Sequence, residues 1–534
     1  MFWREESQKW LNANRIVSHV VVHAIHQNQE DDKRPKMPDG LNTSGCFFNI
    51  KDMYYKRRIN ILYRNYGDFG YLTDNRNFGY RYTNVPAIGD RVLSQSAAII
   101  IDCMGNVAMS AKEVANYAIK RFDDVEYSVL VNDIEELLDT LVADGFFVKG
   151  FSKEDCTKTA AISFDKYHMA ANTEEHNIKK VPDVSSQEFL QNYFGDNPFP
   201  ISVHIEIVGA CNEKCVHCYL PQEAKKGFIS LDLFRNIIIQ VKELNILHLT
   251  LSGGEPMLHP NFIEILSLCN AYDMSINILS NVTNLTKDMV VEMKKNPLLG
   301  VQISLYSMEA GVHDSITGVK GSWSKTMKSI KLLIANKIPI QISCPIMKQN
   351  LSSFNDVKKW GESNSISVSA DYVIIGGSDG SSTNLQNRLQ ITDVCNLIKE
   401  EFEDPISKEI FKSEVANNKY RTKDDYICSV CNSSLCIGIN GDVFPCAGWQ
   451  SCVLGNIKES TLKKIWFDSD KAKWLRNLKR KDLKDCDNCK SIDYCTICLV
   501  RNANESNTHN PLEVNNYFCK VAELKKQIAD KEFL

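Results

Sequence analysis

From residue 201 onward, short apolar runs alternate with longer amphipathic stretches. The apolar runs predict strands at SVHIEIVG, ILHLTLS, SINILSN, GVQISLY, IPIQISCPI and VSADYVII. Between them, stretches such as SLDLFRNIIIQVKELN and HPNFIEILSLCNAYD gather apolar residues on one helical face. Repeated strand–helix units imply parallel strands joined by right-handed crossovers. Six units predict an α/β fold, a partial barrel over residues 201–385 rather than a closed barrel of eight.

The part of the chain before residue 201 has a different pattern. Residues 1–56 form an N-terminal extension that includes the polar linker NQEDDKRPKMPDG, and β-prone pieces follow at CFFNI, INILYRN and FGYLTDN. Three helical segments come next: VLSQSAAIIIDCMG, SAKEVANYAIKRF with Ser110 as N-cap, and LVNDIEELLDTLVADGFFV, which ends near Gly145. Small strands with three helices predict a winged-helix-like domain at 57–150, joined by a bridge at 151–200 to the barrel.

Composition narrows the class of protein. The 534 residues carry 62 Lys and Arg against 66 Asp and Glu, a net charge of −4, so no nucleic-acid partner is expected. No apolar run approaches the roughly 18–20 residues of a membrane span, and no membrane partner is expected. The N-terminus is charged where a signal peptide would be apolar. We therefore expect a cytoplasmic protein.

Cysteine is unusually frequent and unevenly placed. Ten of the 19 cysteines lie between Cys428 and Cys519. Disulfides rarely persist in a reducing compartment, and the chain is long, its cysteine count is odd and no export signal is visible. Thiolates that bind metal explain the pattern better than a disulfide scaffold.

The first cysteine motif follows the first barrel strand. It reads Cys211-Asn-Glu-Lys-Cys215-Val-His-Cys218 and stands at the strand end where barrel enzymes place their chemistry. Three thiolates are one ligand short of a closed zinc site or a complete cubane, so a 4Fe–4S cluster here would keep one iron open. A zinc site or three unrelated cysteines are the alternatives for the motif alone.

A second motif, Gly253-Gly254-Glu255-Pro256, follows the second strand. Its glycines permit close backbone approach to a ligand, and Glu255 can accept from a cation or amine. With the cysteine motif one βα unit earlier, residues 201–385 resemble the radical S-adenosylmethionine (SAM) superfamily. The resemblance implies that the open iron binds the amino and carboxylate groups of SAM, that the GGEP segment contacts the amino group, and that Cys211, Cys215 and Cys218 are catalytic ligands.

Further residues at strand ends match the same superfamily. The resemblance implies SAM contacts from Ser280, Asn281 and Ser304, with Ile374 against the adenine; satisfied loop polar groups and core packing are the alternatives. The segment with His313, Asp314, Gly318, Lys320, Gly321 and Ser322 resembles one in peptide-modifying members, and we expect it to be structural. The superfamily's chemistry is reductive cleavage of SAM to a 5′-deoxyadenosyl radical that abstracts hydrogen.

A connector at 386–427 leads to the second field of cysteines, at 428–534. Asn440-Gly441 predicts a hairpin turn that brings Cys446 back towards Cys428 and Cys431. This field resembles the SPASM extension of radical SAM enzymes. The resemblance implies two auxiliary 4Fe–4S clusters, one bound by Cys428, Cys431, Cys446 and Cys498 and the other by Cys486, Cys489, Cys495 and Cys519.

The cofactors expected are therefore SAM and three 4Fe–4S clusters. One spacing departs from the SPASM pattern, because only two residues separate Cys495 from Cys498, and Cys436 or Cys452 could replace Cys498. Two zinc ribbons are the alternative for CxxC pairs. The basic stretch TLKKIWFDSDKAKWLRNLKRKDLKD predicts a helix with a solvated face.

The N-terminal domain resembles the peptide-recognition domain of ribosomal peptide modification pathways. Its third helix is acidic, which disfavours nucleic acid. In that family a leader peptide adds a strand to the wing. Together the parts resemble a radical SAM/SPASM peptide maturase, an oxidoreductase of the sactisynthase and ranthipeptide-synthase kind. This implies a precursor peptide with a leader as substrate, a flavodoxin or ferredoxin as reductant and, as first choice, a Cys thioether crosslink. Carbon–carbon or carbon–oxygen crosslinking, epimerisation, formylglycine-type maturation and a non-enzymatic metal-binding protein are the alternatives.

Overall fold

The computed structural model describes residues 52–77, 88–161, 192–195, 197–419, 422–428 and 430–533. The chain divides near residue 195 into two compact units, each described here by itself. The N-terminal extension up to residue 51, with the CFFNI piece and the linker, lies outside the described residues, as does most of the bridge. No described helix has the length and apolar character needed to cross a bilayer.

The described residues of the first unit form two small antiparallel sheets and four helices. One sheet has the order β5-β1-β6 and the other β2-β3-β4. The strands are β1 (Tyr54–Arg57), β2 (Ile61–Asn65), β3 (Gly70–Asp74), β4 (Asp90–Leu93), β5 (Met109–Ser110) and β6 (Phe147–Gly150). The helices are α2 (Gln95–Met104), α3 (Ala111–Ala118), α4 (Tyr127–Ala143) and α5 (Lys153–Ala160), with short 3-10 turns η2 (Asn75–Asn77) and η3 (Ile119–Arg121).

The three predicted helices are present and share one core. Side chains from α2, α3 and α4 are buried against the strands. Ser110 caps α3 through a capping box with Glu113. Gly145 follows α4 with φ +85°, a conformation that glycine adopts without steric cost. The packed elements extend beyond the predicted bounds 57–150, because β1 begins at Tyr54 and is the central strand of its sheet, and α5 packs on β1 and β6.

The second unit is built around a nine-stranded sheet. Its order is β12-β11-β10-β9-β8-β7-β13-β14-β15, and the strands from β7 to β12 are parallel in chain order. This confirms the six predicted strands of an open, partial barrel. They are β7 (Ser202–Val208), β8 (His248–Gly253), β9 (Ser275–Ser280), β10 (Leu298–Ser304), β11 (Ile340–Pro345) and β12 (Ser367–Asp371).

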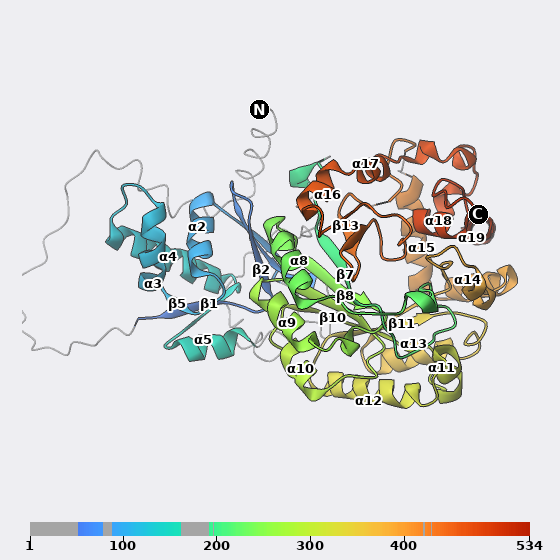
Figure 1. Ribbon diagram of the computed structural model, residues 1–534, viewed down its shortest axis with the longest axis horizontal. Helices are drawn as coiled ribbons and strands as arrows, with labels where there is room; N and C mark the ends of the chain where they lie inside the picture. The colour runs from blue at the N-terminus through green and yellow to red at the C-terminus, as the bar shows by residue number, and fades with distance from the viewer. Residues whose placement is uncertain are drawn as a thin grey trace, which may run out of the picture. The chain divides into compact units, whose positions relative to one another are not determined.

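Helices follow these strands and lie around the outside of the sheet (Figure 1). They are α8 (Leu231–Glu243), α9 (Phe262–Ala271), α10 (Lys287–Met293), α11 (Ala310–Thr317), α12 (Ser322–Ala335) and α13 (Phe354–Ser363), with 3-10 turns η4 (Gln222–Ala224), η5 (Pro256–Leu258) and η6 (Thr383–Asn387). Along the strands, fully buried Val203, Leu249 and Ile303 alternate with partly exposed polar residues such as Thr250 and Gln302. One face of the sheet is therefore apolar, and the other carries polar side chains.

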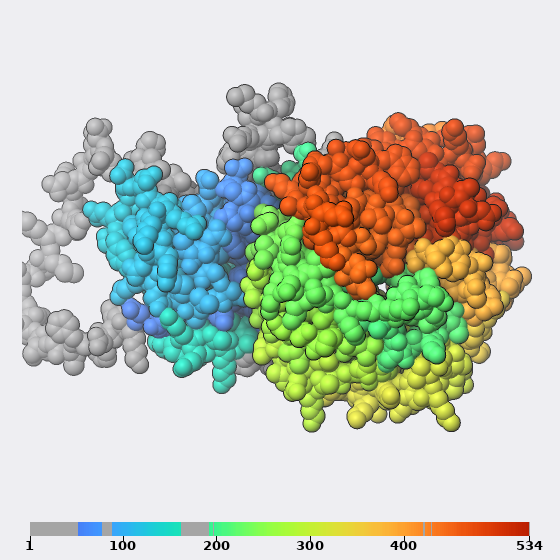
Figure 2. Space-filling view, viewed as in Figure 1, coloured from blue at the N-terminus to red at the C-terminus, as the bar shows by residue number. Residues whose placement is uncertain are grey.

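The C-terminal part extends the same sheet. The predicted hairpin is present as β13 (Ser434–Ile437) and β14 (Asp442–Phe444), with Gly441 at φ +89° in its turn. The sequence pattern did not indicate that β13 pairs in parallel with β7, so that the hairpin continues the barrel sheet. Figure 2 shows the orange and red C-terminal residues against the green and yellow barrel. The remaining elements are β15 (Gly455–Asn456), α14 (Ile391–Glu403), α15 (Pro405–Lys419), α18 (Leu499–Glu505) and α19 (Asn516–Phe533).

The basic stretch at 461–485 is not one helix, as the sequence predicted. It forms α16 (Leu462–Asp468) and α17 (Asp470–Arg476), followed by 3-10 turns η7 (Arg480–Asp482) and η8 (Lys484–Cys486). Ser469 separates the two helices, because its side chain accepts from the backbone N–H of Ala472 and caps α17. A further turn, η9 (Ile492–Tyr494), lies between the cysteines of the C-terminal part.

Candidate iron–sulfur and SAM site

The three cysteines of the first motif lie together just beyond β7. Burial raises the pKa of the Cys215 thiol well above its usual value, and Glu213 and the thiols of Cys218 and Cys211 raise it further. The N–H of Cys218 donates to the carbonyl of Cys215 over 3.1 Å, which closes the loop on itself. Gathered thiols with raised pKa values need a cation to stabilise their thiolate forms, and bound iron would supply it.

Two segments hold this cysteine loop in place. The N–H groups of Lys214 and Val216 donate to the carbonyls of Thr317 and Ile316 at the end of α11, over 2.8 and 3.0 Å. The Asn387 amide donates to the carbonyl of Val216 over 2.8 Å. The loop thus takes its shape from the barrel around it, as a preformed ligand site requires.

The glycines of the GGEP segment are required by a close approach of two chain segments. An added Cβ at Gly253, where φ is +126°, would stand 1.9 Å from the carbonyl oxygen of Val208, and one at Gly254 would stand 2.2 Å from that of Ala210. The N–H of Gly254 donates to Val208 and that of Glu255 to Ala210. The sequence suggested approach to a ligand; the contact observed is with the backbone that leads into Cys211.

Glu255 is fully buried and accepts three hydrogen bonds. They come from the Ser280 hydroxyl over 2.7 Å, the N–H of Asn281 over 2.8 Å and the N–H of Met257 over 3.0 Å. Burial raises the pKa of this carboxyl to about 7, and the three donors oppose that rise. The structure therefore brings Glu255, Ser280 and Asn281 together at the ends of β8 and β9.

Asn281 extends this network to the cysteine motif. Its amide donates to the side-chain oxygen of Asn212 over 2.9 Å, and the Asn212 amide donates to the Thr283 hydroxyl over 2.6 Å. Asn212 is the residue after Cys211, so the end of β9 is linked by side chains to the first thiol.

Tyr306 is a site residue that the sequence analysis missed. It lies two residues beyond the end of β10, where Ser304 contacts its hydroxyl, and only 3% of its surface is exposed. The Tyr306 hydroxyl donates to the Cys215 sulfur over 3.8 Å and lies 3.5 Å from the His217 ring. A polar aromatic residue at a barrel strand end was the only available sequence signal.

Ile374 and the segment after β10 have clear packing roles. Ile374 is buried in a cluster with Tyr306, Ile316 and Met347. This environment fits core packing, which was the alternative to an adenine contact for this residue. Asp314 caps α12, because it accepts from the N–H groups of Gly321 and Trp323 and from the Ser322 hydroxyl. Gly318 ends α11 at φ +68°, so the expectation that this segment is structural agrees with its contacts.

The first auxiliary cysteine set also comes together. Burial raises the pKa of Cys431 to about 12, and the thiols of Cys452, Cys428 and Cys446 contribute. Burial likewise raises the pKa of Cys446, with contributions from Cys498 and Cys428. Cys452 thus stays a candidate ligand beside Cys431.

The second auxiliary set is grouped in the same way. Burial raises the pKa of Cys486 to about 11, and the thiols of Cys495, Cys519 and Cys489 raise it further. Among the described residues, no three His, Cys, Asp or Glu side chains converge tightly enough to share one metal ion. Each auxiliary set supplies the four thiols that either a 4Fe–4S cubane or a tetrahedral zinc ion takes.

A buried polar group lies between the first motif and the first auxiliary set. Glu206 on β7 is 7% exposed, and both its oxygens accept from the Gln450 amide, over 2.9 and 2.8 Å. Burial raises the pKa of Tyr219 well above its usual value, and Glu206, Cys436, Cys218 and Cys446 act in the same direction. The sequence analysis named neither Glu206 nor Tyr219 as a site residue.

Comparison with known proteins identifies both cysteine regions. Residues 205–361 match the radical SAM superfamily, and residues 428–490 match the SPASM iron–sulfur cluster-binding domain. The antilisterial bacteriocin subtilosin biosynthesis protein AlbA of Bacillus subtilis is 27% identical over 332 residues, which are 59% of this chain and 71% of AlbA. An AdoMet-dependent heme synthase of Methanosarcina barkeri is 23% identical, over 55% of this chain and 90% of that protein.

Solved structures share the fold. Streptococcus suis SuiB, bound to its precursor peptide SuiA, superposes with a TM-score of 0.52 at 16% identity, over 87% of this chain and 99% of SuiB. The enzyme anSMEcpe with bound AdoMet and a peptide superposes with a TM-score of 0.50 at 19% identity, over 62% of this chain and 97% of that protein. The partial barrel with its cysteine motif beyond β7 is therefore a radical SAM domain, and the C-terminal cysteine field is a SPASM domain.

Proposed function

We propose that this chain binds SAM through a 4Fe–4S cluster held by Cys211, Cys215 and Cys218, and modifies a ribosomally made precursor peptide. The observation that carries the proposal is the gathering of these three thiols beyond β7, next to the network of Glu255, Ser280 and Asn281. When bound, the cluster supplies the electron that cleaves SAM, and the resulting 5′-deoxyadenosyl radical removes a hydrogen atom from the substrate.

The chain's own residues orient and shield this chemistry. Glu255 holds the ends of β8 and β9 together through its hydrogen bond from Asn281. The Asn281 amide in turn donates to Asn212 and so connects these strand ends to the cysteine loop. Tyr306 donates to a ligand sulfur from a buried position, where it also limits access of water. The proposal also includes the SAM contacts expected from the resemblance at Gly254, Pro256, Ser304 and Ile374. The eight cysteines of the two auxiliary sets would hold two further 4Fe–4S clusters.

The first unit supports a peptide substrate. It is a compact domain with its own core and, among its described residues, two small antiparallel sheets, and strand addition to a sheet is a common mode of peptide binding. The match to the heme synthase covers 90% of that protein but 55% of this chain, so most of the remainder has no counterpart in it. The name of AlbA and the precursor peptide bound to SuiB favour recognition of a leader peptide by this unit.

Within this class we propose thioether formation between a substrate Cys and a carbon of another residue. The radical takes one hydrogen atom from that carbon. Formation of the C–S bond then releases the thiol proton and one electron, which an oxidised carrier of the flavodoxin or ferredoxin type accepts. The relative AlbA, named for the biosynthesis of the bacteriocin subtilosin, supports a peptide product, and the choice of a thioether follows the resemblance to sactisynthases.

The test is reductive cleavage of SAM under anaerobic conditions. We expect the wild-type chain to form 5′-deoxyadenosine, and the Cys211→Ala, Cys215→Ala, Cys218→Ala triple variant to form none. Continued formation by the triple variant would show that the site is wrongly assigned. Thioether formation is then tested by mass spectrometry on the candidate precursor: the product should lose two hydrogen atoms and one alkylatable thiol. A product that keeps all its thiols would favour a different crosslink or epimerisation.

A further inference from the structure

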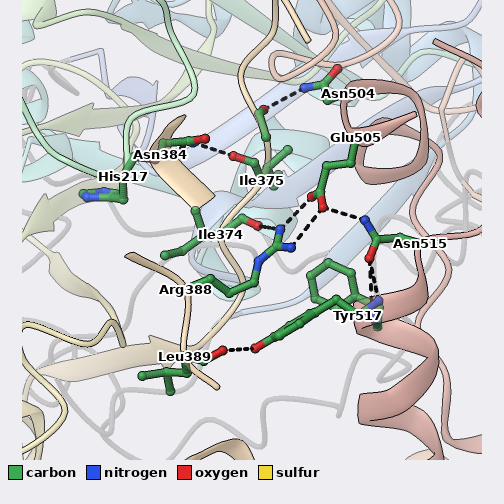
Figure 3. Close-up of polar contacts among 12 residues, drawn as sticks. His217, Ile374, Ile375, Asn384, Arg388, Leu389, Asn504, Glu505, Asn515 and Tyr517 are labelled. Carbon is green, nitrogen blue, oxygen red and sulfur yellow. Dashed lines mark hydrogen bonds and ion pairs between the residues drawn. The ribbon is translucent and has the colours of Figure 1, made fainter. Parts of the chain in front are cut away.

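A buried ion pair joins the barrel to the C-terminal helices. Arg388 and Glu505 are 117 residues apart in the chain, and their side chains are 8% and 9% exposed. The guanidinium donates from Nη1 to Oε2 over 2.9 Å and from Nη2 to Oε1 over 2.6 Å (Figure 3). This two-point geometry fixes the orientation of both side chains as well as their separation.

The surroundings of the pair supply further contacts to both side chains. Arg388 Nη2 also donates to the carbonyl of Ile374 over 2.5 Å, and its guanidinium stacks 4.7 Å from the centre of the Tyr517 ring. The Asn515 amide donates to Glu505 over 2.5 Å. Buried charges are costly unless they are paired and hydrogen-bonded in this way, so the pair strongly resists rearrangement.

On the barrel side, the contacts lead to the cysteine loop. Arg388 donates to the carbonyl of Ile374. The Asn384 amide connects the next residue of that segment to the cysteine loop, because it donates to the carbonyl of Ile375 over 2.8 Å and to that of His217 over 3.2 Å (Figure 3). His217 lies between Cys215 and Cys218. One asparagine therefore connects the segment held by Arg388 to the backbone of the first motif.

On the C-terminal side, the contacts lead to the auxiliary cysteines. Glu505 is the last residue of α18, which begins directly after Cys498. Asn515 accepts from the N–H of Tyr517 near the start of α19, the helix that carries Cys519. The Asn504 amide donates to the carbonyls of Gly376 and Gly448, which ties the same barrel segment to the loop after Cys446.

We infer that Arg388 and Glu505 are positioning residues for the SAM site. The pair holds residues 374–376 against the C-terminal helices, and Asn384 transmits that placement to the loop that carries Cys215 and Cys218. Loss of the pair therefore displaces the His217 backbone and weakens SAM binding without removing any cluster ligand. This inference rests on the proposed function, because it assigns the pair to the SAM site of residues 211–218.

The test is the Glu505→Gln variant, which keeps the size of the side chain and removes its charge. We expect wild-type iron content and a dissociation constant for SAM that rises about tenfold, the effect typical of residues behind a metal ligand. The direct readout is the spectrum of the reduced first cluster, whose change on SAM addition should need correspondingly more SAM. The matched control is Glu532→Gln, which breaks the more exposed Lys408–Glu532 pair of α15 and α19 and should leave SAM affinity unchanged.

A double-mutant cycle with Asn384→Ala separates positioning from general destabilisation. If the two side chains act along one path, the double variant should bind SAM about as weakly as the weaker single variant. If Glu505→Gln does not fold, Arg388→Lys keeps the charge but loses the two-point geometry and takes its place. Wild-type SAM affinity in these folded variants, or additive effects in the cycle, would overturn the inference. Failure of the wild-type chain to bind or cleave SAM would instead overturn the proposed function.

Discussion

At the scale of single residues, burial determines how the polar groups of the site behave. Burial raises the pKa of Glu255 and of Glu206 to about 7, but their partners differ. Glu255 accepts from three donors on neighbouring strand ends, whereas both oxygens of Glu206 accept from the Gln450 amide. Glu255 is therefore part of the frame of the proposed SAM site, and Glu206 links β7 to the loop after Cys446.

Gly254 gives the sharpest prediction at this scale. Gly254→Ala places a Cβ 2.2 Å from the backbone oxygen of Ala210, a contact that no side-chain rotation relieves. We expect a loss of about 3 kcal/mol in the free energy of unfolding, with loss of SAM cleavage. Thermal unfolding and 5′-deoxyadenosine formation measure the two effects. Gly311→Ala is the control: its Cβ meets nothing within 4 Å, and as an exposed helical position it should gain up to about 1 kcal/mol.

Tyr306 makes a prediction about the first cluster itself. Tyr306→Phe removes the hydroxyl that donates to the Cys215 sulfur and leaves the buried ring in place. Hydrogen bonds to cluster sulfurs raise the reduction potential, so we expect a lower midpoint potential and a smaller reduced fraction of the first cluster at a fixed donor potential. Potentiometric titration followed by electron paramagnetic resonance checks this. The auxiliary clusters are the internal control, and equal shifts in all three potentials would contradict a local role for Tyr306.

At the scale of elements, what could be predicted depends on the range of the interactions. The strands β7 to β12 and the caps at Ser110 and Gly145 follow from local patterning, and both cysteine motifs and the hairpin turn at Gly441 are equally local. The parallel pairing of β13 with β7 and the Arg388–Glu505 pair join residues far apart in the chain. Spacing and periodicity carry no information on such pairings. Ser469 divides a stretch whose charges favour a helix throughout, so that break was also missed.

Asp314 tests whether the element after β10 is structural. Asp314→Ala removes the acceptor for the N–H groups at the start of α12, so we expect a loss of about 1–2 kcal/mol in the free energy of unfolding. The variant should retain iron and cleave SAM at a near wild-type rate at low temperature, where it stays folded. Denaturant unfolding and a cleavage assay on the same preparation decide the point. Full stability with lost cleavage would make Asp314 a catalytic residue.

At the scale of the whole molecule, the cysteine sets predict a metal content. Three sets of thiols, one of three and two of four, predict about twelve iron atoms per chain after anaerobic reconstitution. The triple alanine variant of the first motif should retain about eight, because the auxiliary thiols lie on separate elements of the C-terminal part. Iron and zinc analysis on both proteins provides the measurement. About four irons with two zinc ions in the wild-type chain would replace the auxiliary clusters with zinc sites.

The division of the chain into two units leads to the last prediction. The first unit has its own core, and every proposed cluster ligand lies in the second. If the first unit binds a leader peptide, deletion of residues 1–195 should strongly reduce modification of a leader-bearing peptide and largely spare SAM cleavage without peptide. A leader supplied separately should compete in the full chain and have no effect on the truncated one.

Both rates are measured on truncated protein whose iron content matches that of the full chain, so that a damaged cluster cannot imitate a lost binding site. Equal loss of both rates would mean that the first unit supports folding rather than recognition. Unchanged peptide modification would mean that the substrate is recognised by the second unit alone. In that case a maturase that acts on a folded protein, of the formylglycine-forming type, would become the better proposal, because such an enzyme has no need of a separate leader-binding domain.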